Sequence, residues 1–74
     1  MHDDNLKRMA NQIGLFFESM PNRDEALHGI AKHLKNFWDP RMRKAFLHQV
    51  DEPNPQGISE IVLAAVHAHR DLIG

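Results

Sequence analysis

Residues 37–43, which read Phe-Trp-Asp-Pro-Arg-Met-Arg, set a sharp boundary between two helices. Asp39 is a good N-cap, and Pro40 suits the first helical position because its ring holds φ near the helical value. A residue that precedes proline is also driven away from helical geometry, so the earlier helix has to end first. The stretch therefore predicts two helices joined with almost no loop, with Phe37 and Trp38 at the elbow.

Apolar residues recur at alternating steps of three and four along most of the chain, as on a helix with one buried face. Before the elbow, Asn22 followed three residues later by Glu25 resembles a capping box and starts a helix. Beyond position 50, Pro53, Pro55 and Gly57 predict a linker rather than a continued helix. The expected helices span residues 4–19, 23–38, 40–50 and 59–73, and the linker spans residues 51–57.

These elements predict an all-α fold: one small four-helix domain over residues 1–74, with a sharp helix–helix elbow at Trp38-Asp39-Pro40. A chain of 74 residues buries only about 60% of its unfolded surface. Because it has no cysteine, disulfides add nothing to its thin core. Stability beyond the helix packing must therefore come from association, which favours a subunit over an independent enzyme.

Three features predict how the helices pack. The first helix presents an apolar stripe of Leu6, Met9, Ile13, Phe16 and Met20. The last helix has apolar residues over about 200° of its wheel, more than the roughly 100° of a surface helix, so it is expected to face two surfaces. Glycine inside a helix costs about 1 kcal/mol relative to alanine. Close helix approach would explain both Gly14 and Gly29, and tolerance of a weak helix former explains Gly29 equally well.

Net charge and hydropathy exclude several classes of partner. The formal net charge is −1 and the pI is about 6.6, so no field attracts the chain to nucleic acid or an anionic membrane. No apolar run approaches the roughly 18 residues of a membrane span, and the polar start Met-His-Asp-Asp-Asn lacks the apolar segment of a signal peptide. We therefore expect a cytoplasmic protein with neither a nucleic-acid nor a membrane partner.

The six histidines raise the question of a metal site. On a helical wheel His67 and His69 lie about 160° apart, and His28 and His33 point to nearly opposite sides. Neither pair has the i, i+4 spacing of helical zinc ligands. The pattern predicts surface or packed histidines, with His69 in the core, and no metal site.

The sequence also lacks the motifs of common catalytic sites. It has no cysteine, no Gly-x-Ser-x-Gly turn, no glycine-rich phosphate loop and no isolated carboxylate pair beside a histidine. A four-helix domain of this length can hardly enclose the pocket of some hundreds of cubic ångströms that catalysis needs. We predict no catalytic residues, no cofactor-binding residues and no enzymatic activity for this chain.

The helix predicted from Pro40 carries its charges in the reverse of the order that the helix dipole favours. Basic residues crowd its first turns and acidic residues follow its end: Arg41, Arg43, Lys44, Asp51 and Glu52. Each misplaced exposed charge costs about 0.3–1 kcal/mol, so compensation is expected. Arg43 lies in the apolar arc, which leaves two explanations open. It forms an internal ion pair with Asp39 or another acid, or it anchors a partner protein, since arginine and large aromatic residues dominate interfaces.

Two segments of the chain resemble one known family. They read Met-Ala-Asn-Gln-Ile-Gly-Leu-Phe-Phe at residues 9–17 and Ile-Ala-Lys-His-Leu-Lys-Asn-Phe-Trp-Asp-Pro-Arg-Met-Arg at residues 30–43. Together they are similar to the delta subunit of the soluble NAD-dependent formate dehydrogenase. The likeness covers most of residues 6–50 and is most specific at residues 37–43.

The resemblance implies a small accessory subunit of a cytoplasmic complex that oxidises formate to carbon dioxide and reduces NAD. In that family the molybdenum or tungsten pterin, the iron–sulfur clusters, the flavin and NAD belong to the larger subunits. The delta chain is expected to hold none of them, in agreement with a cysteine-free sequence that offers no thiolate to a cluster. Its implied partners are the larger subunits, the catalytic one first, and self-association of the isolated chain is an open alternative.

The predicted function is assembly or stabilisation of this complex, through the elbow between the second and third helices. Two rivals stay open: a transient maturation factor that helps to insert the pterin cofactor, and a helical DNA-binding regulator that uses the basic residues of the third helix. The near-neutral charge speaks against the second rival. The predicted partner interface comprises Asn11, Gln12, Phe17, His33, Phe37, Trp38, Arg41 and Arg43.

Overall fold

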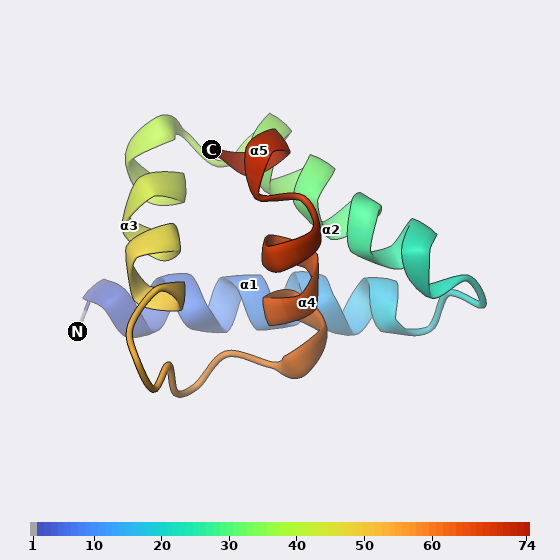
Figure 1. Ribbon diagram of the computed structural model, residues 1–74, viewed down its shortest axis with the longest axis horizontal. Helices are drawn as coiled ribbons and strands as arrows, with labels where there is room; N and C mark the ends of the chain where they lie inside the picture. Colours follow the sequence, from blue (N-terminus) through green and yellow to red (C-terminus); the bar gives the residue numbers. More distant parts are fainter. Residues whose placement is uncertain (1) are drawn as a thin grey trace.

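The structure is a computed structural model that describes residues 2–74, with side chains described for residues 5–74. It is all-α, as predicted, and its described residues form no strand. The helices are α1 (His2–Glu18), α2 (Arg23–Phe37), α3 (Pro40–Val50), α4 (Glu60–Ala68) and α5 (Arg70–Ile73) (Figure 1). No helix in the described part of the chain is both long and apolar enough to cross a bilayer.

The elbow between α2 and α3 has the predicted local cause. Trp38 is extended, with φ −92° and ψ 137°, and its backbone N–H donates to Leu34 O at 3.1 Å to close the last turn of α2. The Asp39 carboxylate then accepts from Met42 N at 2.9 Å and caps α3, and Pro40 is the first residue of that helix. The elbow therefore follows from capping and from the restriction that proline places on the preceding residue.

The helix expected over residues 59–73 is interrupted, which corrects the sequence prediction. His69 leaves helical geometry, with φ −130° and ψ 36°, and separates α4 from α5. The interruption turns the chain so that Ile73 packs into the core and Arg70 reaches Asp51 at the end of α3. Both contacts are tertiary, so the periodicity of the sequence contains no sign of the break.

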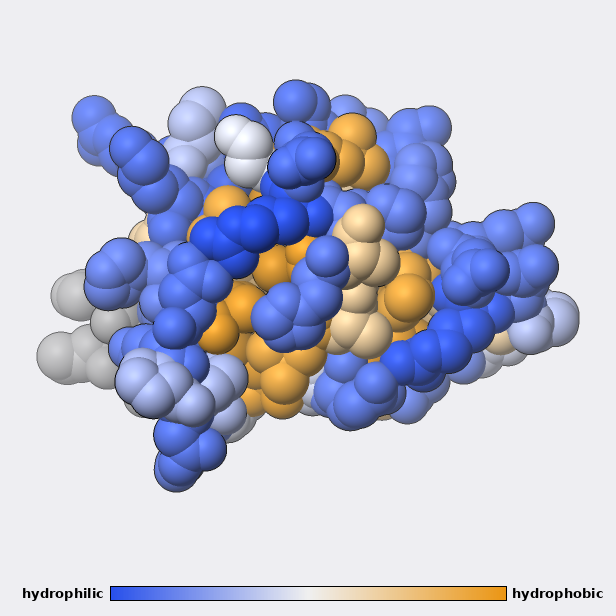
Figure 2. All heavy atoms as spheres, in the orientation of Figure 1, coloured by the Kyte–Doolittle hydropathy of each residue, from blue (hydrophilic) through white to orange (hydrophobic). Residues whose placement is uncertain are grey.

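The core lies where α2 packs against α1, α4 and α5, and α4 also packs against α1. Its members come from all five helices and the elbow: Ala10, Ala26, Leu27, Ile30, Ala31, Leu34, Trp38, Phe46, Val50, Ile61, Val62, Ala65, Val66 and Ile73. Leu63 and Ala64 of α4 pack only partly on this cluster. Figure 2 accordingly shows hydrophobic surface between α3 and α4, within a hydrophilic surround. The second face of this helix is thus only partly covered.

The stripe predicted on α1 is wrong at Phe16. Its side chain is 72% exposed, although the neighbouring positions Met9, Ile13 and Met20 pack on the core as expected. Phe17 takes the inward place instead, because Gly29 of α2 leaves room for its ring. The interhelical contact, rather than the spacing of apolar residues, decides which phenylalanine is covered.

Both helical glycines lie at close helix contacts. An added Cβ at Gly14 would stand 2.8 Å from Cγ2 of Val62, and one at Gly29 would stand 2.5 Å from Cε1 of Phe17. These distances are below van der Waals contact, so each glycine permits an approach that alanine would block. For Gly29 this settles the choice that the sequence left open, in favour of close approach.

We expect Gly29→Ala to lower the free energy of unfolding by about 1 kcal/mol, because overpacking of about 1–3 kcal/mol exceeds the gain in helix propensity of about 1 kcal/mol. Gly14→Ala should cost more, since Val62 is stiff at χ1 and held within α4, whereas the ring of Phe17 can turn outward. Urea unfolding followed by circular dichroism measures both. Stabilisation by both substitutions would contradict the close helix approach.

An ion pair joins the end of α3 to the start of α5. Arg70 Nη1 and Nη2 donate to Asp51 Oδ1 and Oδ2 at 2.7 and 2.6 Å. These hydrogen bonds lower the pKa of Asp51, against a smaller opposing effect of desolvation, and they raise the pKa of Arg70. The pair also accounts for an acidic residue at the end of α3, where the dipole of that helix alone disfavours it.

Acid should weaken this link in a defined pH range. A carboxyl group whose pKa is lowered by folding contributes stability above its unfolded pKa, about 3.9, and loses it as the pH falls through the folded value. We therefore expect the wild-type chain to be more stable than Asp51→Asn at pH 7, and the difference to vanish below the folded pKa. Urea unfolding across this range is the measurement. A difference that persists in strong acid would show that the contribution is not ionic.

Candidate functional site

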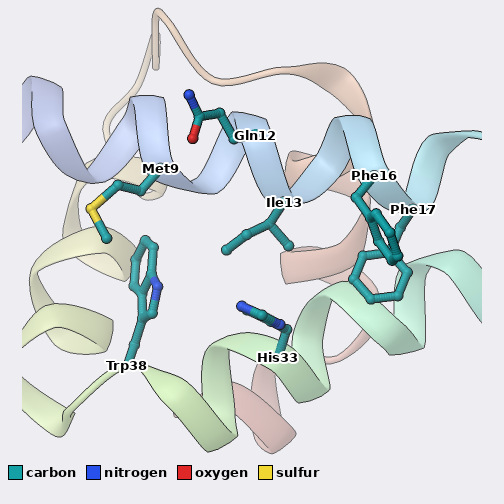
Figure 3. A pocket seen from close by; sticks show the side chains of 7 residues that line it. All are labelled: Met9, Gln12, Ile13, Phe16, Phe17, His33 and Trp38. Carbon is teal, nitrogen blue, oxygen red and sulfur yellow. The ribbon is translucent and has the colours of Figure 1, made fainter.

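A groove of about 490 Å³ runs between α1 and α2 (Figure 3). The residues that line it are Met9, Gln12, Ile13, Phe16, Phe17, His33 and Trp38. Its volume lies within the range of ligand-binding pockets. From the length of the chain we expected no pocket of this size. The domain has one because the groove is not enclosed but opens at the surface between two helices.

The two helices and the elbow each form one part of the groove. Met9 and Trp38 stand at one end and the two phenylalanines at the other, while Ile13 and His33 face each other between them (Figure 3). Trp38 is only 5% exposed and packs edge-on against Phe46 at a centroid distance of 5.5 Å. The elbow thus places one indole ring in both the core and the groove wall.

Two exposed aromatic rings adjoin the groove. Phe16 packs edge-on against Phe17 at a centroid distance of 5.1 Å, and Phe37 lies against His33 at 4.6 Å. Phe16 and Phe37 are 72% and 73% exposed, so each keeps most of its surface in water. Exposed apolar surface beside a hollow is typical of an interaction site.

Three polar side chains interrupt the apolar lining. Gln12 offers an amide, His33 an imidazole and Trp38 an indole N–H, which can only donate. The hydrogen bonds of residues 5–74 include none from these three side chains. In Figure 3 the nitrogens of Trp38 and His33 point into the groove. A bound partner could therefore form hydrogen bonds as well as apolar contacts there.

Five of the eight residues predicted for the partner interface gather at this groove. Gln12, Phe17, His33 and Trp38 line it, and Phe37 packs on His33. The other three lie elsewhere. Sequence reasoning missed Met9, Ile13 and Phe16 as groove residues, because their helical spacing indicated a core stripe.

Asn11 holds the linker on α1. Its Nδ2 donates to Gly57 O at 2.8 Å and its Oδ1 accepts from Ser59 N at 2.9 Å. The two bonds fix the backbone where the linker enters α4. The structure therefore gives Asn11 a role within the chain.

Arg43 makes an internal contact of a kind that the sequence did not suggest. Its Nη1 donates to Lys35 O at 2.6 Å, a carbonyl in the last turn of α2. A cation at a helix C-terminus is favoured by the dipole, so α2 compensates for the unfavourable place of Arg43 in α3. The bond is to a carbonyl rather than to Asp39 or another acid. Arg41, by contrast, is exposed in the first turn of α3.

A family model described as the NADH-dependant formate dehydrogenase delta subunit FdsD matches residues 5–66 of the 74 residues. The chain belongs to this family. The match confirms the resemblance read from the two sequence segments, and it covers most of α1, all of α2 and α3, and most of α4. No curated protein and no solved structure matches the chain.

The cofactors of formate dehydrogenase can be tested against the residues of this delta-subunit chain. An iron–sulfur cluster needs thiolate ligands, and the chain has no cysteine. Among the described side chains, no three His, Asp or Glu residues are grouped so as to hold a metal ion. His28 and His69 do meet edge-on at a centroid distance of 5.3 Å. His69 is only half-buried, at the break between α4 and α5, rather than in the core as predicted.

Proposed function

We propose that this chain is a non-catalytic accessory subunit that assembles or stabilises a cytoplasmic NAD-dependent formate dehydrogenase, in which other subunits oxidise formate and reduce NAD. The observation that carries the proposal is the aromatic groove between α1 and α2, with Phe16 and Phe37 exposed beside it. Membership of the delta-subunit family makes the other formate dehydrogenase subunits its partners. The pterin, iron–sulfur clusters, flavin and NAD are proposed to lie on those subunits.

Mass action provides the physical route to stabilisation. A chain that binds only the folded form of a larger subunit raises its apparent stability by RT ln(1 + [L]/Kd), about 2.7 kcal/mol at a hundredfold excess over Kd. Binding raises the apparent stability of the small delta chain by the same mass action. The affinity comes from covering aromatic surface that is otherwise in water. Each partner then supports the fold of the other.

Co-purification tests the accessory role. We expect a tagged delta chain, expressed with its partners, to co-purify with active formate dehydrogenase. The molar ratio of delta chain to the other subunits should stay constant through successive columns. Cells that lack the chain should yield less assembled complex. If the chain instead accompanies only the immature, cofactor-free catalytic subunit and is absent from active enzyme, it is the transient maturation factor.

The purified chain alone should not reduce NAD with formate, because the redox centres are proposed to lie on other subunits. The assay follows NADH absorbance, and metal analysis of a preparation purified without an affinity tag accompanies it. The assembled complex, at the same molar amount of delta chain, is the positive control. A rate that survives further purification would refute the non-catalytic role. One equivalent of tightly bound iron or zinc would refute the prediction that the chain has no metal site.

A further inference from the structure

The α1 wall of the groove has the spacing of a helix-binding surface. Met9, Ile13 and Phe16 lie at steps of four and three, so the wall extends for two turns, about 10 Å at 1.5 Å per residue. A helix laid along such a wall contacts it with side chains at positions i, i+3 or i+4, and i+7. The groove therefore has the length of two turns of an occupant.

The backbone chemistry of the groove favours a helix over an extended segment. Both walls are helices, whose backbone groups are already paired along their length. An extended segment pressed onto these walls would bury its own N–H and C=O groups, and each unpaired group costs about 1–3 kcal/mol. A helix pairs these groups internally and needs only side-chain contacts.

The Trp38 indole N–H defines one polar requirement of the occupant. It donates to none of the described residues and points into the groove (Figure 3). An occupant that covered it with an apolar group would leave a buried donor unpaired. The occupant therefore has to bring a side-chain oxygen to the Trp38 end.

Charge beside the groove defines the flank of the occupant. Gln12 lines the groove and also a second hollow on α1, whose other described lining residues include Lys7, Arg8 and Leu15. Within residues 5–74, neither hollow has an acidic residue in its lining. Arg8 lies one turn before Gln12 on α1, whereas Lys7 lies on the far side of the helix against Gly57. A carboxylate on the side of the occupant that lies over α1 would therefore meet the cation of Arg8, with no acid in the lining formed by residues 5–74.

We propose that the groove binds one amphipathic helix of a larger formate dehydrogenase subunit, with its apolar residues in the groove, a side-chain oxygen at Trp38 and a carboxylate toward Arg8. The inference rests on the proposed function and adds the form and chemistry of the docking segment. Phe16 covers one end of the bound helix, and Phe37 extends the contact beyond His33.

Site-specific crosslinking in the whole complex tests this assignment. A photoreactive benzophenone amino acid replaces Phe16 in one chain and the exposed Ala68 of α4 in a matched control. We expect the probe at Phe16 to crosslink to one segment of a larger subunit, with apolar residues at steps of three and four and acidic residues on one side. The control probe should not reach that segment.

The other outcomes of the crosslinking experiment are decisive too. A crosslink from position 16 to a loop, to a strand-like segment or to a second copy of this chain would overturn the helix assignment. A crosslink to the larger subunit from position 68 but not from position 16 would overturn it as well. If the chain co-purifies with its partners but the probe at Phe16 captures none of them, the groove inference fails and the proposed function stands. If the chain does not co-purify at all, the proposed function itself fails.

Substitution by glutamate provides a second measurement. Because Phe16 and Arg8 are exposed, Phe16→Glu and Arg8→Glu should leave the fold intact, which circular dichroism checks. We expect Phe16→Glu to reduce complex recovery about tenfold or more, and Arg8→Glu to reduce it more at low salt than at high salt. Lys44→Glu is the control for charge, and it should have the smaller effect. Equal losses for Arg8→Glu and Lys44→Glu would contradict the acidic flank.

Discussion

Trp38→Ala is expected to lower the free energy of unfolding by about 3–5 kcal/mol, which would leave most of the isolated chain unfolded. Trp38 is 5% exposed and packs edge-on against Phe46, a fully buried residue of α3. Its removal would open a cavity at the point where α2 turns into α3. Urea unfolding followed by circular dichroism measures the loss. Without urea, the helical signal of the variant should also be weaker than that of the wild type.

The neighbouring residue provides a matched control for this prediction. Phe37 is also aromatic and also at the elbow, but it is 73% exposed. We expect Phe37→Ala to change the free energy of unfolding by no more than about 0.5 kcal/mol, as for an ordinary surface substitution. Trp38→Phe should lie between the two alanine variants, because it keeps a ring against Phe46. Equal losses for Trp38→Ala and Phe37→Ala would show that the elbow is not part of the core.

The second large effect is expected at Asn11, where alanine should cost about 1–3 kcal/mol. The substitution removes both the donor to Gly57 O and the acceptor for Ser59 N–H, and it leaves these backbone groups without their partner. The linker should then loosen from α1 and the start of α4 should fray. Amide hydrogen exchange at Ser59 reports this directly, and urea unfolding gives the free energy.

Two variants sharpen the test of Asn11. Asn11→Asp keeps an acceptor for Ser59 N–H but loses the donor to Gly57 O, so its cost should be intermediate. Gln12→Ala, at the next position of α1, removes an exposed side chain that bonds to no described residue and should leave the isolated fold unchanged. If the Asn11→Ala chain unfolds like the wild type but no longer binds its partners, Asn11 is part of the partner interface, as the sequence predicted.

The residues predicted for the partner interface fall into two groups with different roles. Phe37, Gln12 and His33 are available to a partner, whereas Asn11 and Arg43 hold the chain's own backbone. Arginine in an apolar arc is compatible with both purposes in a sequence, because only the position of a neighbouring helix shows whether a carbonyl lies within reach. The interface itself stays a prediction for the crosslinking experiment.

The sequence by itself determined the features that arise from neighbours along the chain. Asp39 and Pro40 specify the elbow through a cap and a restricted backbone, Asn22 caps α2 by accepting from Glu25 N, and the apolar periods specify the helices. These interactions extend over no more than one helical turn. They involve no contact between helices, so they can be predicted without the fold.

Only the tertiary structure decided the features that depend on how the helices meet. Phe17 rather than Phe16 turns inward because Gly29 of a different helix leaves room for its ring. The break at His69 places Ile73 in the core and Arg70 on Asp51, nineteen residues away. The groove exists because α1 and α2 supply facing walls. The periodicity of each helix specifies a buried face but not the neighbour that covers it, and that choice is made by shape and charge across the contacts.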